Sequence, residues 1–228
     1  MKNLVSFTII NIVKFLSHIF YRFEVNWLSD ATERKWDDVR LIVFLNHTSL
    51  FEPIFLTQAP TGFAWRISKD IVVPGADITI NRPIVGRFFK WIIPGMVSIT
   101  RKRDSSWKSF MQSINRESIV AILPEGRMKR KSGLDKDGQP MSVRGGIAEI
   151  LKYLDHGKAL FVYSGGLHHI QTPGQKFPKL FKKARVNFEM MDIKHYKQKF
   201  ESLKLNAKEY RNAVMADLNE RLKTKIPD

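Results

Sequence analysis

The chain of 228 residues contains no cysteine. This absence excludes a disulfide framework and a catalytic thiol, and it leaves the redox compartment undecided. The adjacent histidines His168 and His169 have no carboxylate at the spacing of metal ligands on a helix. We therefore predict no metal site. No Gly/Ser-rich or Pro-rich linker divides the sequence, and 43% hydrophobic content can form one sizeable core. We therefore expect a single α/β domain over residues 31–228, preceded by an N-terminal segment, residues 1–30.

Acidic residues are scarce relative to basic ones. The 38 Lys and Arg residues against 22 Asp and Glu residues give a formal net charge of +16. Such an excess favours an anionic partner: nucleic acid, an anionic membrane surface, or a phosphorylated or acidic donor. Aromatic and cationic residues are not interleaved as in RNA-binding motifs, so we expect no specific nucleic-acid site. The simpler alternative is a solvated basic face.

The N-terminal segment is apolar but lacks an unbroken hydrophobic run of bilayer length. Its uncharged stretch between Lys2 and Lys14 is shorter than the roughly 20 residues that a spanning helix needs. Polar residues recur at three- and four-residue steps: Asn11, Lys14, His18 and Arg22. This pattern favours an amphipathic helix at the cytoplasmic face of a membrane, peripheral or monotopic, with Tyr21 and Trp27 as interfacial anchors. The alternative is a helix packed on the core of its own domain.

After this segment, short apolar runs alternate with helical patterns. Such alternation is typical of an α/β fold whose central sheet, mostly parallel but mixed, is flanked by helices. The expected strands are Arg40–Leu45, Phe63–Ser68, Met96–Thr100, Ile119–Leu123, Leu160–Tyr163 and Val186–Met190. The expected helices lie near Ile54–Gln58, Ile84–Ile92, Ser105–Arg116, Gly146–Leu154 and Ala207–Lys223.

The most informative segment is residues 41–53, where a histidine and a carboxylate follow an apolar strand. Open α/β sheets place their chemistry at such strand ends. A neutral imidazole at His47 can accept a proton from a hydroxyl, and the carboxylate of Glu52 can orient it and stabilise the imidazolium. Pro53 disfavours a helical conformation at Glu52 and suits the first position of a helix. The alternative is a solvated loop histidine before an acidic helix start.

A second apolar strand, ending near Leu123, leads into the turn Pro124-Glu125-Gly126-Arg127. Two such strand ends can converge on one crevice. The cations of this turn are Arg127, Lys129, Arg130 and Lys131. Arginine grips phosphate with two parallel hydrogen bonds and lysine adds charge, so we expect a phosphate site here. Arg101 ends another predicted strand and is expected to reach the same phosphate. The alternative is a solvated basic loop.

Residues 46–53 resemble the histidine, four residues, aspartate block of the 1-acyl-glycerol-3-phosphate acyltransferase family, within the lysophospholipid acyltransferases. Residues 123–127 resemble its Phe-Pro-Glu-Gly-Thr-Arg block. Residues 83–86 with 95–101, and residues 143–146, match further segments in the expected order. The chain departs from the family where Glu52 replaces aspartate and where Arg127 follows Gly126 without a threonine. It departs again in residues 160–166, a late strand that lacks the family's proline.

The resemblance implies a membrane-associated acyltransferase with His47 as the general base and Glu52 as its partner. It implies substrate binding by six residues: Arg101, Glu125, Gly126, Arg127, Lys129 and Arg130. The implied donor is acyl-CoA or acyl carrier protein, used as a co-substrate with no other cofactor, and the implied acceptor is a lysophospholipid. The departures leave two alternatives: another lipid acceptor, such as lipid A or an amino-lipid, or a non-catalytic peripheral membrane protein that retains the fold.

Overall fold

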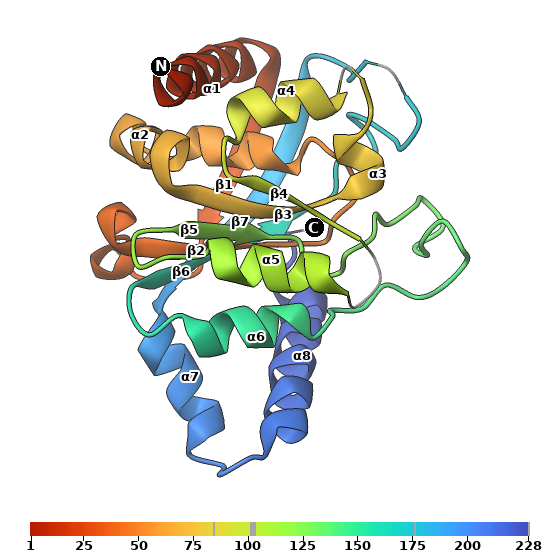
Figure 1. The fold of residues 1–228 in the computed structure, drawn as a ribbon. Coiled ribbons are helices and arrows are strands. Elements are labelled where there is room, and N and C mark those ends of the chain that lie inside the picture. The colour runs from red at the N-terminus through yellow and green to blue at the C-terminus, as the bar shows by residue number, and fades with distance from the viewer. Residues whose placement is uncertain (84, 101–103, 176, 228) are drawn as a thin grey trace.

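The computed structural model describes residues 1–83, 85–100, 104–175 and 177–227. A seven-stranded sheet lies between two layers of helices (Figure 1). The strands are β1 (Tyr21–Trp27), β2 (Val39–Leu45), β3 (Ile71–Ala76), β4 (Met96–Ile99), β5 (Ile119–Ile122), β6 (Lys158–Ser164) and β7 (Lys182–Asp192). Their order across the sheet is β1-β7-β6-β2-β5-β3-β4. The predicted α/β class with a mostly parallel, mixed sheet is therefore confirmed.

Strand pairing places the carboxyl ends of β2 and β5 side by side. These two strands are parallel neighbours, with Leu41 opposite Val120 and Val43 opposite Ile122. The pair β6–β7 is antiparallel, and the other neighbouring strands run parallel. The two segments singled out in the sequence, residues 46–53 and 123–127, therefore leave the sheet at the same edge.

One layer of helices covers the upper face of the sheet as drawn in Figure 1. It contains α1 (Lys2–Phe20), the 3₁₀ helix η3 (Glu52–Gln58), α2 (Thr61–Asp70), α3 (Asp77–Ile80) and α4 (Val85–Ile92). The lower face is covered by α5 (Ser105–Ser113), α6 (Gly146–Tyr153), α7 (Ile193–Glu201) and α8 (Ala207–Thr224). Two short 3₁₀ helices, η1 (Ala31–Glu33) and η2 (Trp36–Asp38), connect β1 to β2.

Strand β2 shows how the core is divided between the two faces. All seven of its residues are buried. Because side chains alternate along a strand, Leu41 and Val43 join the core under α5, α6 and α8, whereas Ile42 and Phe44 join the core under η3 and α2. Burial on both faces explains why residues 41–45 of this strand are an unbroken apolar run in the sequence.

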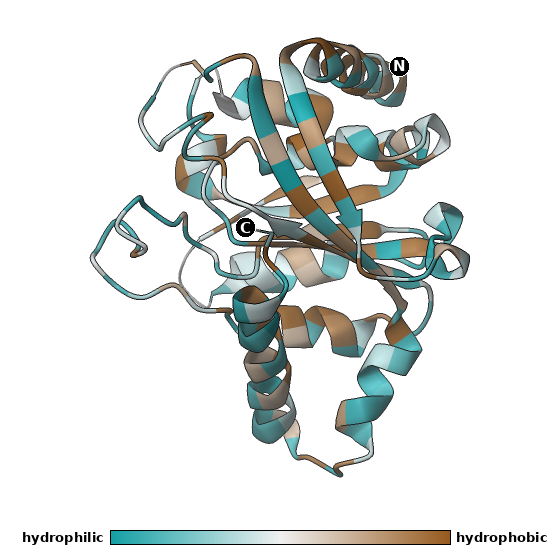
Figure 2. Ribbon diagram, turned by 180° about the vertical axis from the view of Figure 1, so that it is seen from behind, coloured by the Kyte–Doolittle hydropathy of each residue, from teal (hydrophilic) through white to brown (hydrophobic). Residues whose placement is uncertain are grey.

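In α1, polar residues are buried against the domain and large apolar residues are exposed, the reverse of the usual surface helix. Its buried residues are Ser6 and Ser17, whose hydroxyls donate to Ile92 O at 2.6 Å and to Thr57 Oγ1 at 3.1 Å. Several of its large apolar side chains are exposed, among them Phe15 at 66%, and Figure 2 shows many apolar residues along this helix. Within the described residues, α1 is the one helix long and apolar enough to cross a membrane, by length and composition.

The N-terminal helix is shorter than the predicted segment 1–30. It ends at Phe20, and residues 21–27 form β1, which pairs along its length with β7. Tyr21 is buried in the core, and Trp27 packs against Trp36 and Phe188. The prediction of these two residues as interfacial anchors at a helix end was therefore wrong. Alternating burial along Tyr21–Trp27 is weak, so the sequence offered little sign of a strand.

The predicted strand Phe63–Ser68 was also wrong, because these residues belong to α2. Phe63, Ala64, Ile67 and Ser68 are buried, and this three- and four-residue spacing is that of one helix face. The strand starts immediately afterwards, at Ile71, and β3 was missed together with α7. The strands predicted at Arg40–Leu45, Met96–Thr100, Ile119–Leu123, Leu160–Tyr163 and Val186–Met190 are confirmed within one to four residues at their ends.

Candidate active site

The turn after β2 is held in a conformation that few residues adopt. Asn46 has a φ of 67°, in the left-handed region that asparagine tolerates better than most residues. Its side-chain amide donates to Ser164 O at 2.8 Å, at the end of β6. These two features turn the chain sharply away from the sheet and place the next residue, His47, at the carboxyl end of β2.

His47 is paired with Glu52 as the sequence predicts. Nδ1 of His47 lies 2.9 Å from Oε2 of Glu52. Because a carboxylate only accepts, Nδ1 carries the hydrogen and Nε2 is the acceptor nitrogen of the neutral ring. Within the described part of the chain, Nε2 has no hydrogen-bond partner. The imidazole is therefore oriented through one nitrogen and free to accept a proton at the other.

Glu52 is completely buried, and both of its carboxylate oxygens are engaged. Its Oε1 accepts hydrogen bonds from the backbone N–H groups of Thr48 and Ser49 and from the Thr48 hydroxyl, at 2.7–2.8 Å. The chain brings it there because Glu52 opens η3, with Pro53 at the second position. The loop of residues 47–52 thus closes on itself around one carboxylate.

Glu125 holds the same turn from the neighbouring strand. Its two carboxylate oxygens accept the backbone N–H of Asn46 at 2.7 Å and of His47 at 3.0 Å. The following Gly126 has a φ of 65°, where a side chain would be strained. The side chain that follows β5 therefore fixes the backbone of the residue that follows β2.

Burial and neighbouring carboxylates set the protonation of this group of side chains. Burial disfavours the His47 imidazolium, but the charge of Glu52, its hydrogen bond and the charge of Glu125 outweigh burial and raise the pKa of His47 above 6.5. Burial also raises the pKa of Glu125 to about 7, against the opposing effects of His47 and the two N–H donors. Glu125 therefore titrates near neutral pH, and the pKa of His47 lies above its ordinary value.

His47 lines a cavity of about 640 Å³ at the carboxyl edge of the sheet. One part of its wall is apolar and comes from β3, α3 and α4, including Val73, Ile80 and Phe89. The opposite part comes from the start of α6 and from α8, and carries arginine side chains. The cavity therefore joins the imidazole to an apolar region and to a cationic region.

The predicted substrate-binding cations take different positions. Arg127 lines the cavity and pairs through Nη1 with Asp135. Lys129 contacts the back of the His47 turn: its N–H donates to His47 O at 2.7 Å and its Nζ to Asn46 Oδ1 at 3.3 Å. Arg130 bonds through its N–H to Leu134 O, in the loop that protrudes beyond α5 in Figure 1. Arg101 lies outside the described residues.

Two arginines of the cavity wall were not among the residues predicted from the sequence. Arg144, just before α6, donates from Nε to Glu125 O at 3.1 Å, and Arg211 comes from α8. The segment 143–146 was noticed as a motif, but nothing in the pattern of α8 distinguishes Arg211 from the other cations of that helix. Among the described residues, no group of three or more His, Asp or Glu side chains is arranged to hold a metal ion.

The fold is similar to that of a known enzyme structure. No protein-family model and no curated protein sequence matches the chain. The structure is similar to that of the 1-acyl-sn-glycerophosphate (LPA) acyltransferase, PlsC, from Thermotoga maritima, with a TM-score of 0.56 and 13% sequence identity. The alignment covers 94% of this chain and 78% of that chain. At this identity the likeness establishes a shared fold.

Proposed function

We propose that this protein is an acyltransferase that moves an acyl group from a thioester to a hydroxyl group of a lysophospholipid. The observation that carries the proposal is the His47–Glu52 pair, with Nε2 of His47 unpartnered within the described residues, beside a cavity of about 640 Å³. The fold shared with an LPA acyltransferase supports the same reaction class. The donor is acyl-CoA or acyl carrier protein, and both are anionic, as the net charge of +16 favours.

The proposed reaction is a direct transfer. The acceptor hydroxyl donates to Nε2 of His47 and loses its proton as its oxygen attacks the thioester carbonyl carbon. Glu52 keeps Nδ1 protonated and stabilises the imidazolium. The tetrahedral intermediate then collapses, the C–S bond breaks, and the imidazolium returns the proton to the leaving sulfur. The apolar wall of the cavity, with Ile80 and Phe89, suits the alkyl chain.

We also propose that the protein works at a membrane surface, with α1 lying in the interface. On its outer face, Leu4 and Phe15 are 62% and 66% exposed. On its inner face, two serine hydroxyls form hydrogen bonds with the domain. Trp91 of α4 and Phe181, which contacts Phe20, add further exposed aromatic surface at this end of the molecule. Apolar surface of this kind, on a cationic protein, suits an anionic bilayer.

The first experiment is a thioester-cleavage assay with acyl-CoA and 1-acyl-glycerol-3-phosphate in mixed vesicles. Replacing His47 with alanine should lower the rate by about 10²–10⁴-fold, since that is the usual contribution of a general base. The His195→Ala variant is the matched control, because His195 is exposed on α7. Full transfer by His47→Ala would exclude this residue as the base. A wild-type protein that binds vesicles but transfers nothing would favour the non-catalytic alternative.

A further inference from the structure

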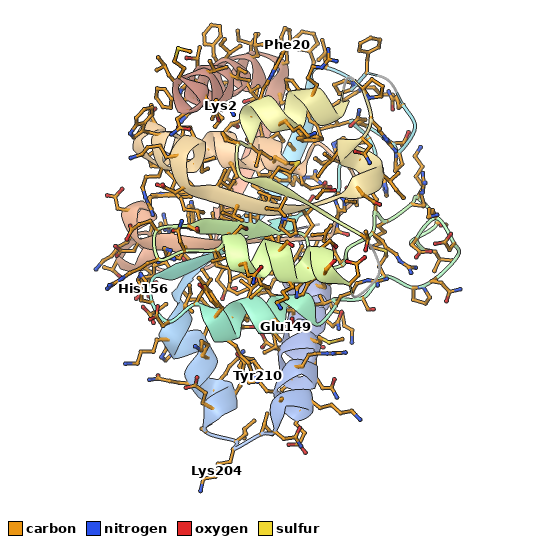
Figure 3. All side chains as sticks on the ribbon, viewed as in Figure 1. Lys2, Phe20, Glu149, His156, Lys204 and Tyr210 are labelled. Atoms are coloured by element: carbon orange, nitrogen blue, oxygen red, sulfur yellow. The ribbon has the colours of Figure 1, made fainter. Side chains whose placement is uncertain are left out.

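Two arginines outside the basic turn of residues 127–131 line the cavity together with Arg127. They are Arg144, just before α6, and Arg211, on α8. Both lie in the cavity that also contains His47. Figure 3 shows α6 and α8 side by side here, with Glu149 of α6 and Tyr210 of α8 labelled.

Arg211 differs from Arg127 in how its charge is balanced. Arg127 is paired with Asp135 and lies 3.9 Å from Asp137. The Nε of each arginine is buried without an acceptor, but Arg211 makes no hydrogen bond or ion pair at all within the described residues. A buried donor on a charged group that lacks a partner is unfavourable. Arg211 therefore has the binding capacity for an anion that enters the cavity.

Two glycines allow close approach to the start of α6, by Arg211 at Gly145 and by Trp107 at Gly146. A Cβ added to Gly145 would lie 2.4 Å from Nε of Arg211, and one added to Gly146 would lie 2.7 Å from the Trp107 ring. Side chains at these positions would push both neighbours away. The start of α6 lines the same cavity, and among the described residues its N-cap, Gly145, makes no side-chain capping hydrogen bond.

Among the described residues, the one carboxylate on this wall is already engaged. Glu149 accepts a hydrogen bond from Trp107 Nε1 at 2.7 Å. Arg144 is held by its Nε against Glu125 O, which fixes its position beside the Pro-Glu-Gly turn. Arginine forks and helix N-terminal N–H groups are the usual ligands of phosphate.

We propose that Arg211, together with Arg144 and the start of α6, binds a phosphate group of a substrate. The assignment to a substrate rests on the proposed function, but the binding of phosphate does not. Two sources share this chemistry: the head-group phosphate of the lipid acceptor, and a phosphate of the acyl donor. Arg211 is then a specificity-determining residue for a phosphorylated substrate, across the cavity from the apolar wall.

The first measurement is binding of inorganic phosphate to the full-length protein, by calorimetry or ³¹P line broadening. Arg211→Gln should weaken binding by about tenfold or more, as expected for loss of a charged hydrogen-bond donor. Gly145→Ala should weaken it as well, because the added methyl group displaces the guanidinium while the net charge stays the same. The control is Lys208→Gln, which removes one exposed charge from the same helix. Equal affinity in all four proteins would overturn the site.

The second measurement separates the two sources of phosphate. Transfer is compared with 1-acyl-glycerol-3-phosphate or monoacylglycerol as acceptor, and with acyl-CoA or acyl-pantetheine as donor. Arg211→Gln should raise KM by about tenfold for one phosphorylated substrate and leave KM for the phosphate-free analogue of that substrate unchanged. An unchanged KM for both phosphorylated substrates would overturn the assignment. The wild-type protein could transfer nothing while Arg211→Gln still binds inorganic phosphate more weakly than wild type does. In that case the proposed function fails and the phosphate site remains.

Discussion

In the proposed mechanism His47 accepts a proton, and two carboxylates in different positions influence its pKa. Glu52 touches the ring directly through Nδ1, whereas Glu125 touches only backbone N–H groups. Glu52 therefore acts on the imidazole, and Glu125 acts on the position of the turn. Both carboxylates favour the imidazolium, so the base is neutral only toward higher pH.

The pH profile of acyl transfer should show this control. A general base must be neutral, so kcat/KM should fall as pH decreases through the pKa of His47, which lies above 6.5. Glu52→Gln removes the nearest negative charge, so this limb should move to lower pH while the plateau of kcat falls by roughly 10²-fold or more. KM for both substrates should change little. The measurement is a series of steady-state rates across neutral pH.

Glu117→Gln is the matched control for that series, because Glu117 is exposed and precedes β5 at the opposite edge of the sheet. Its profile should coincide with that of the wild-type protein. If the acid limb of Glu52→Gln also coincides with wild type, Glu52 does not set the pKa of His47, and its orienting role is wrong.

The His47–Glu52 pair could be predicted from sequence because the information is local. His47 follows the end of a strand, Glu52 comes five positions later, and Pro53 comes next. This spacing is sufficient to bring the two side chains into one loop. The contacts of Glu125 could not be predicted, since they require the register in which β2 and β5 pair. The position of Arg211 is even harder to predict, because it depends on α8 packing against the start of α6. The periodicity of α8 does not indicate this packing.

At the scale of elements, the strands that could be predicted are those buried on both faces. β2 and β6 are almost entirely buried, so each contains a continuous apolar run, residues 41–45 and 159–163. β1 is an edge strand with mostly exposed residues, and it looks like the end of the preceding helix. The segment Phe63–Ser68 was assigned to a strand because a short helix buries four residues within six positions. A short apolar segment is consistent with both the helix period of about 3.6 residues and the strand period of 2 residues.

Two glycines allow a test of how closely these elements approach one another. A Cβ at Gly95 would lie 1.9 Å from Ile71 O, where β3 and β4 meet, so Gly95→Ala should lower the free energy of unfolding by about 1–3 kcal/mol. A Cβ at Gly62 in α2 would meet nothing within 4 Å, so Gly62→Ala should raise it by about 0.4–1 kcal/mol. Urea unfolding followed by circular dichroism measures both. Similar shifts in the two variants would contradict the close approach at Gly95.

At the scale of the whole molecule, the helices on the two faces of the sheet differ in what they expose. The α1 end presents apolar side chains outward, whereas α7 and α8 at the opposite end are polar and basic on their outer surfaces (Figures 1 and 2). The cavity lies between these ends, and part of its wall comes from α4, which packs beside α1. A bilayer against α1 would therefore lie close to the apolar part of the cavity, where a lipid chain would enter.

Vesicle binding should depend on the α1 end and not on exposed apolar residues in general. Phe15→Glu should weaken binding to vesicles of phosphatidylglycerol and phosphatidylcholine by about tenfold or more, because one buried aromatic side chain contributes roughly 1.5–3 kcal/mol. The matched control is Leu203→Glu. Leu203 is 61% exposed, against 66% for Phe15, and lies beside Lys204 at the tip farthest from α1 (Figure 3). Both variants change the net charge equally. Co-sedimentation with the vesicles measures the difference, and equal losses would mean that charge alone, and not the face of α1, attaches the protein to lipid.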